Sequence, residues 1–242
     1  MSNQFNNTLI VHFHSEEWLL TICDKTNKPV STKRIPAFLS TLSEEEIVQI
    51  IAKEPEMQQQ YHEVRFVCES DFYTFVPTAV FKENDTDDMF HFIHEKNKNA
   101  VVLHNVLTAW KMVNIFSIPV MLHNALLHFY PQSIIEHHLT YYLNDVIKHP
   151  ANNRLYVWVA NRKLDIVAFK NGTVELINRF GYQIPEDFIF HILNVFEQLS
   201  LDIENCKVQL YNAEQRNELL TMLRKYVNVK PLQSPPKEGI GD

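Results

Sequence analysis

One stretch of the sequence, Leu155 to Leu199, has the densest apolar patterning in the chain and limits the folds open to it. Three short runs rich in β-branched and aromatic residues predict strands, over Leu155 to Ala160, Lys163 to Phe169 and Thr173 to Phe180. The dipeptide Asn171-Gly172 predicts a tight turn between the last two runs, because both residue types tolerate positive φ. The stretch therefore predicts an antiparallel meander of three strands.

A helix is predicted directly after this meander. Pro185 is suited to its first position, and Glu186 and Asp187 suit the positive end of its dipole. Apolar residues then recur with helical spacing at Phe188, Ile189, Ile192, Leu193, Phe196 and Leu199.

The remainder of the second half predicts one more strand and one more helix. The strand is Cys206 to Tyr211, and Asn212 with Gln215 is suited to cap the helix that follows. The apolar face of this helix is predicted to consist of Leu219, Leu220, Leu223 and Tyr226.

The first half repeats this order of elements. The predicted strands are Leu9 to His14, Trp18 to Asp24, Lys28 to Ile35 and Glu63 to Cys68, with one helix before the fourth. That helix is predicted to begin at Ser43, with Glu46 completing a capping box and Leu42 with Ile47 forming a hydrophobic staple. Three strands, a helix and a strand are the order of a ribonuclease-H-like fold.

Additional elements lie between the fourth strand and the end of the first half. They are a strand at Tyr73 to Val76, a helix at Asp85 to Lys96 with Met89, Phe90 and Ile93 inward, a hairpin of Ala100 to Leu107 with Lys111 to Ile118, a helix from Pro119, and a strand followed by a helix within Ile134 to His149. The breaker cluster Pro150 to Asn153 marks the boundary between the halves. We therefore expect an N-terminal half with an inserted hairpin at 1–150, a C-terminal half at 151–230 and a disordered tail at 231–242.

The composition narrows the possible partners. Charges sum to −7 with no dense Lys/Arg cluster, so nucleic acid is not the expected partner. No apolar run is long enough to insert into a membrane, and three cysteines without Cys-x-x-Cys spacing fit a reducing, cytoplasmic location. The remaining expectation is a protein partner, and the sequence does not specify an oligomeric state.

Two segments carry a resemblance to a known family. The stretch LYVWVANRKLDIVAFKNGTVELINRFGYQIPEDFIFHILNVFEQLSLD, together with FVPTAVF at Phe75 to Phe81, resembles an uncharacterised bacterial domain-of-unknown-function family. The resemblance implies an actin-like ATPase fold, that is, an α/β protein of two ribonuclease-H-like halves. It implies no activity.

The turns that would hold phosphate in catalytic members of such a fold lack the expected Asp-Gly chemistry. They correspond to 14–17 and 160–163, and neither contains the glycine that lets a backbone approach phosphate closely. The adjacent Glu16 and Glu17 would repel an anion, and a third position near 211–213 also lacks glycine. We therefore expect a degenerate nucleotide site, and we assign no catalytic residue, no cofactor-binding residue and no cofactor.

The sequence contains 12 histidines, and three groups of them have a spacing to weigh as metal ligands. Asp87, His91 and His94 share the i, i+4, i+7 spacing of one helical face, a spacing that also suits the solvated side of a surface helix, which is the favoured interpretation. His137 and His138 are neighbours that point apart on a helix, and His12 and His14 share a strand face without a third ligand. We therefore assign no metal ligand.

A cysteine and a basic turn are two further candidates for function, and the sequence favours a structural role for both. Cys68 lies in an apolar strand near His62, which favours a buried thiol over a reactive one. The turn Asn161, Arg162 and Lys163 is favoured as a solvated hairpin tip over a ligand clamp. The leading hypothesis is a non-catalytic actin-like binding or assembly module, and the alternative is a divergent nucleotide-dependent phosphotransferase or ATPase with atypical phosphate loops.

Overall fold

The computed structural model describes residues 6–146, 152–211 and 217–232. The chain divides into two compact units, Met1–Asn144 and Asp145–Asp242. Met1–Asn144 is unit 1, and Asp145–Asp242 is unit 2.

Unit 2 contains one mixed sheet with the order β11-β10-β9-β12-β13. Its strands β9 to β11 form the antiparallel meander, and β12 and β13 run parallel to β9. The elements are β9 (Arg154–Ala160), β10 (Lys163–Lys170), β11 (Thr173–Gly181), α5 (Pro185–Gln198), β12 (Lys207–Tyr211), α6 (Asn217–Leu223) and β13 (Val229–Leu232).

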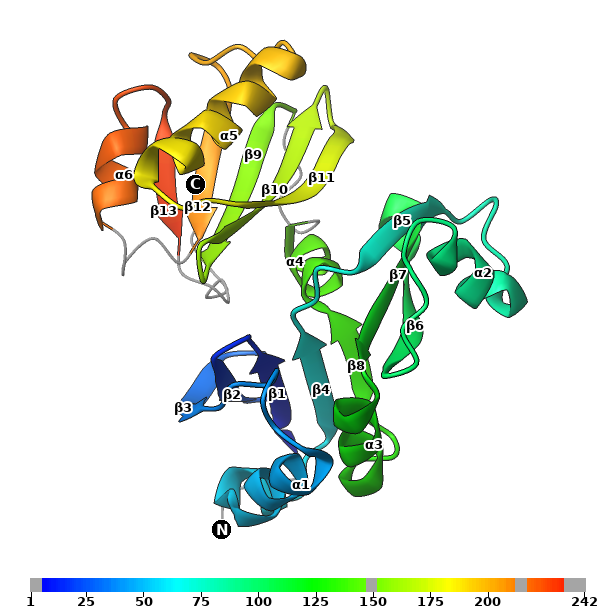
Figure 1. Ribbon diagram of the computed structural model, residues 1–242. Coiled ribbons are helices and arrows are strands. Elements are labelled where there is room, and N and C mark those ends of the chain that lie inside the picture. Colours follow the sequence, from blue (N-terminus) through cyan, green and yellow to red (C-terminus); the bar gives the residue numbers. More distant parts are fainter. Residues whose placement is uncertain (1–5, 147–151, 212–216, 233–242) are drawn as a thin grey trace. The chain divides into compact units, whose positions relative to one another are not determined.

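The predicted turn and helix of unit 2 are both confirmed. Asn171 and Gly172 have φ values of 53° and 79°, the left-handed conformation that a two-residue hairpin turn requires. Phe188 and Ile192 on α5 are fully buried against the sheet, and Figure 1 shows α5 lying across the strands with α6 beside β13. The apolar stripe therefore positions α5 as the cover of one sheet face.

Unit 1 repeats this topology, with a sheet of order β3-β2-β1-β4-β8 in which β1, β4 and β8 run parallel. Its elements are β1 (Thr8–Phe13), β2 (Glu17–Cys23), β3 (Pro29–Pro36), α1 (Glu44–Lys53), η2 (Pro55–Gln58), β4 (Glu63–Cys68), α3 (Val120–Phe129), β8 (Ile134–His137) and α4 (His138–Val146). Omitting the short η2, the segment between β4 and α3, and the final α4 of unit 1, both units read βββαβαβ. This repeat is the duplication that the order of elements predicted.

The start of α1 confirms the predicted capping box. The Glu46 backbone N–H donates to Oγ of Ser43 at 3.3 Å, and the Ser43 N–H donates to Oε2 of Glu46 at 2.8 Å. Ile47 and Ile51 are fully buried in a core cluster that also contains Leu122 of α3. The capping box therefore fixes the start of α1, and the burial of Ile47 and Ile51 places the apolar stripe of the helix in the core of unit 1.

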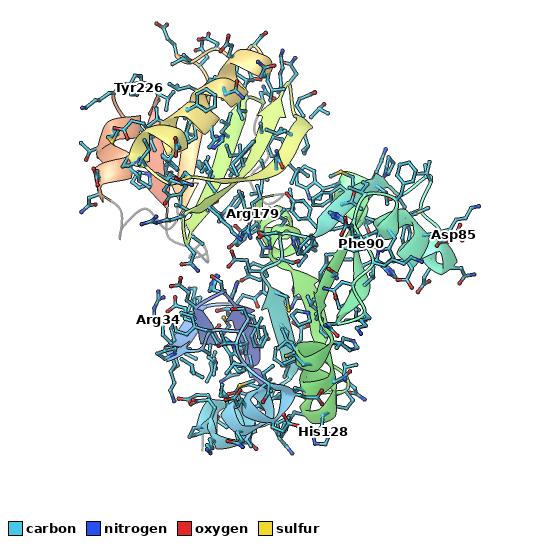
Figure 2. All side chains as sticks on the ribbon, viewed as in Figure 1. Arg34, Asp85, Phe90, His128, Arg179 and Tyr226 are labelled. Atoms are coloured by element: carbon cyan, nitrogen blue, oxygen red, sulfur yellow. The ribbon has the colours of Figure 1, made fainter. Side chains whose placement is uncertain are left out.

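The insert is the segment Tyr73–Pro119, which forms its own three-stranded antiparallel sheet of order β5-β7-β6. Its elements are β5 (Tyr73–Pro77), η3 (Glu83–Asp85), α2 (Thr86–His91), β6 (Ala100–Leu107), η4 (Thr108–Trp110) and β7 (Met112–Pro119). Phe90 of α2 packs with Val113 and Ile115 of β7 on one face of this sheet. Figure 2 shows Asp85 at the outer end of the insert.

One side chain joins the insert to the edge of the main sheet of unit 1. Nδ2 of Asn105 donates to the carbonyl oxygen of Ile135 at 3.0 Å, and its Oδ1 accepts from the His137 backbone N–H at 2.9 Å. Asn105 thus satisfies backbone groups of β8 that another strand would otherwise satisfy. The insert therefore covers this edge of the sheet.

The C-terminal end predicted for the insert helix, α2, was wrong. The helix stops at His91, not Lys96, and Ile93 has 63% of its surface exposed, whereas an inward position was expected. Beyond the helix, Nε2 of His94 lies 3.0 Å from the Tyr73 carbonyl oxygen. This tertiary contact turns the chain away from the helical path.

Two predictions near the C-terminus also differ from the structure. Tyr226 lies beyond the end of α6 and is half-exposed, so it is not part of the apolar face of that helix. β13 includes Pro231 and Leu232, which the sequence had assigned to the tail. Proline is tolerated there because β13 is an edge strand that needs no further N–H donor. The predicted caps Asn212 and Gln215 lie outside the described residues.

Candidate functional site

The topology indicates where a ligand would bind in each unit. In open α/β sheets, ligands bind outside the carboxyl ends of the parallel strands. In unit 1 these ends belong to β1, β4 and β8, and in unit 2 to β9, β12 and β13. The two turns that the sequence identified follow β1 and β9.

The turn after β1 is a closed hairpin. The His14 backbone N–H donates to the Glu17 carbonyl oxygen at 3.0 Å, and the Glu16 carbonyl oxygen accepts from the Ala37 N–H at 3.0 Å. The side chain of Glu17 pairs with Arg34, whereas Glu16 is exposed. The turn therefore uses the His14 N–H internally and presents a carboxylate, a combination that disfavours an anionic ligand.

The turn after β9 is left-handed without glycine. Asn161 and Arg162 have φ values of 42° and 59°, and the Tyr182 N–H donates to the Arg162 carbonyl oxygen at 2.9 Å. Glycine would adopt these values without a Cβ, whereas here each residue carries a side chain at the position where the backbone would approach a phosphate. Arg162 is exposed at this hairpin tip.

Aromatic rings fill the carboxyl end of β12. Tyr211 stacks on Trp158 with ring centroids 4.8 Å apart and an interplanar angle of 6°. Burial raises the pKa of the Tyr211 hydroxyl well above its usual range. Asn212 and Ala213, where a glycine pair would make room for a base, lie outside the described residues.

In unit 1, the carboxyl ends of β1 and β8 bring together histidines that are far apart in the sequence. The His12 and His14 rings lie with centroids 6.0 Å apart, and the His137 and His138 rings lie 4.1 Å apart. Nδ1 of His14 lies 3.0 Å from Oε2 of Glu69, which follows β4. The sequence identified each histidine pair but did not predict that the two pairs lie at the same end of the sheet. The position of each pair at the end of a predicted strand was the signal that could have indicated it.

His137 belongs to a buried polar network. Its Nε2 lies 3.0 Å from the Ser70 carbonyl oxygen, and its Nδ1 lies 2.9 Å from Nδ2 of Asn114. The same Asn114 nitrogen lies 3.0 Å from Oγ1 of Thr140. This network joins the insert to the start of α4, so it explains His137 as a structural residue.

His12 is the member of this group that lies within β1. Its side chain is 5% exposed, and its Nε2 is buried without a hydrogen-bond partner among the described residues. Burial, followed by the nearby His14 and His138, lowers the pKa of His12 to about 3. His12 is therefore neutral in the folded protein at physiological pH.

This pKa predicts a loss of stability in mild acid. The unfolded chain binds a proton at His12 below a pH of about 6.5, whereas the native state does so only near pH 3. The free energy of unfolding therefore falls as the pH drops through this window. Between about pH 7 and pH 5, the His12 contribution is about 2 kcal/mol.

Urea unfolding at both pH values checks this expectation. The variant His12→Gln carries no titrating group at this position, so it should lose about 2 kcal/mol less than the wild type over the same interval. Equal losses in the two proteins would contradict the assignment.

The Asp87, His91 and His94 trio does not converge on one point. Nδ1 of His91 lies 3.2 Å from the His94 carbonyl oxygen, while the His94 ring packs on Phe90 with centroids 4.5 Å apart. His94 is thus partly inside the insert, not on the solvated side of a helix as expected. Over the described ranges, no three His, Cys, Asp or Glu side chains are grouped to hold a metal ion.

Cys68 occupies the position expected of a structural residue. Its side chain is 1% exposed, and burial raises the pKa of its thiol to about 12. A thiol with such a pKa carries little thiolate at neutral pH.

Within the part of the chain that the structure describes, no helix is long and apolar enough to cross a membrane.

Solved structures define the class of protein. A Bacteroides thetaiotaomicron protein with an actin-like ATPase fold and unknown function matches with a TM-score of 0.80 and 22% identity, covering 98% of this chain and 94% of that chain. The PilM-PilN type IV pilus biogenesis complex matches with a TM-score of 0.60 and 10% identity over 94% and 90% of the two chains. The ethanolamine utilization protein EutJ from Carboxydothermus hydrogenoformans matches with a TM-score of 0.50 and 9% identity over 92% and 84%. The protein therefore has the actin-like ATPase fold, as the sequence predicted.

The sequence also defines the family. Residues 1–229 match the family described as protein of unknown function (DUF3822), and the chain belongs to it. No curated protein sequence matches the chain.

Proposed function

We propose that this protein is a non-catalytic binding or assembly module built on the actin-like fold. The observation that carries the proposal is the turn after β9, where Asn161 and Arg162 occupy left-handed positions that glycine would leave open. The hairpin after β1 supports it, because its His14 N–H is used internally and Glu16 is exposed beside it. Neither turn is suited to cradle a polyphosphate.

A second line of support comes from one structural relative. The PilM-PilN structure is a complex of two proteins in type IV pilus biogenesis, so a chain of this fold takes part in protein assembly there. At 10% identity this is analogy at the level of the fold. It supports a protein partner without indicating which one.

The alternative is a divergent nucleotide-dependent phosphotransferase or ATPase. The observation that favours it is the exposed Arg162, a cation at the carboxyl end of β9 where a phosphate would lie. In such an enzyme, the guanidinium would replace part of the backbone cradle. The two proposals therefore differ in whether Arg162 contacts a nucleotide.

Thermal unfolding with ATP and magnesium separates the two proposals. A nucleotide at about 100 times its Kd would stabilise the fold by about 2.7 kcal/mol, which raises Tm by roughly 5–10 °C for a chain of this size. We expect no shift. A saturable rise that is lost in Arg162→Ala would reject the binding module and favour the alternative.

A further inference from the structure

We infer that the end of α2 is a docking surface for a basic, apolar peptide segment of a partner protein. The inference rests on the proposed binding function and assigns a surface and a partner chemistry to it. The surface, called the α2 patch below, consists of Phe72, Phe92 and Ile93.

The α2 patch is exposed to an unusual degree. Phe92 has 90% of its surface exposed, Ile93 63% and Phe72 59%. Phe90, two residues before Phe92, is 3% exposed and packs in the core of the insert. The helix therefore has its own buried anchor, and the packing of the insert does not require Phe92 or Ile93. Phe92 and Ile93 are adjacent in the sequence, and exposed apolar side chains that gather at one site are typical of interaction sites.

The α2 patch is held in place by His94. The His94 ring packs on the buried Phe90 and lies edge-on to Phe72, with ring centroids 5.9 Å apart in the second pair. Its Nε2 lies 3.0 Å from the carbonyl oxygen of Tyr73, the residue after Phe72. This contact brings the start of β5 to the chain that follows α2. The three apolar residues are thus presented on a preorganised surface, which reduces the entropy lost on binding.

The charge around the α2 patch specifies the partner. Residues 83–95 contain five acidic side chains and no Lys or Arg, and with the three flanking lysines Lys82, Lys96 and Lys98 the segment 82–98 still carries a net charge of −2. Asp88 lies one helical turn before Phe92, and both Asp87 and Asp88 are exposed. Glu95 is exposed on the other side of Ile93 in the sequence. An apolar surface with an acidic rim is complementary to a segment that carries apolar anchors and Lys or Arg.

The same charge disfavours two other occupants. An anionic membrane surface attracts basic segments and would repel this rim. A second copy of the chain would place identical acidic rims opposite each other in a two-fold interface. The chain also carries a net charge of −7, which opposes self-association.

Selection from a phage-displayed library of random short peptides tests the inference on the full chain. The double variant Phe92→Ser/Ile93→Ser removes the apolar anchors. Phe190→Ser is the matched control, because Phe190 is an exposed phenylalanine in unit 2 with 63% exposure. We expect the selected peptides to bind the wild type and Phe190→Ser with equal affinity. Their affinity for the double variant should be lower by about tenfold or more.

The selected peptides should carry an excess of Lys and Arg beside apolar residues. Their affinity, measured by fluorescence polarisation, should fall with added salt and in Asp87→Asn/Asp88→Asn. Circular dichroism of each variant verifies that the fold is retained. Selected peptides that are acidic, or that bind the double variant equally well, would overturn the inference.

Two further measurements complete the test. If the wild type sediments as a dimer and Phe92→Ser/Ile93→Ser sediments as a monomer, the partner at the α2 patch is a second copy of the chain. If the wild type co-sediments with anionic vesicles, the partner is a membrane. Either result overturns the inference. All binding is measured without nucleotide, so failure at the α2 patch is distinguishable from a positive ATP result, which would reject the proposed function itself.

Discussion

Replacing Arg179 with methionine should cost about 3–5 kcal/mol of the free energy of unfolding, because it breaks a buried ion pair. Nε of Arg179 lies 2.7 Å from Oδ1 of Asp165, and Nη2 lies 2.7 Å from Oδ2. The two side chains are 8% and 4% exposed. Arg179→Met leaves the Asp165 carboxylate buried without its guanidinium. Figure 2 labels Arg179, which lies on β11.

A second cross-strand pair provides the control. Arg34 and Glu17 also join neighbouring antiparallel strands, but their side chains are 53% and 34% exposed. Solvent screens such a pair, so Arg34→Met should cost only about 0–1 kcal/mol. Urea unfolding measures both variants, and hydrogen exchange of β10 and β11 amides locates the loss in unit 2. A cost below about 1 kcal/mol for Arg179→Met would contradict the prediction.

Replacing Phe188 with alanine should cost about 3–5 kcal/mol, because it leaves a cavity in the core of unit 2. Phe188 is fully buried where α5 packs on the sheet, in the same cluster as Val157 and Ile166. The first turn of α5 is held in place by Asp187, whose carboxylate accepts from the Gln183 N–H at 3.0 Å. The helix cannot shift freely to fill the space that the ring leaves.

Phe190→Ala on the same helix is the matched control. The ring of Phe190 is 63% exposed, so its removal should change the free energy of unfolding by about 0.5 kcal/mol or less. Equilibrium urea unfolding measures the pair. Equal costs at the two positions would show that the face of α5 that carries Phe188 is not buried against the sheet.

Much of the fold follows from local sequence signals. The Asn171-Gly172 turn, the Ser43 and Glu46 capping box and the three-stranded meander of the second half were all predicted, and the structure contains each of them. These features depend on residues within a few positions of one another. The repeated order of elements in the two halves could be read for the same reason.

The candidate site was less predictable, since it depends on contacts between distant residues. The turns after β1 and β9 were identified, but the left-handed backbone of Asn161 and Arg162 was not. Helical periodicity placed Ile93 inward, whereas the helix ends at His91, the His94 side chain contacts the Tyr73 carbonyl oxygen and Ile93 is exposed. No pattern within the helix contains that information.

The sequence by itself determined most of the elements, their order and the absence of glycine in the turns after β1 and β9, because these are properties of short segments. The tertiary structure alone decided that His12 is buried beside His14 and His138, and that Asn105 covers the edge of β8. It also decided that Phe92 is left at the surface. Burial and pairing depend on which elements meet after folding, and residues far apart in the chain determine those meetings.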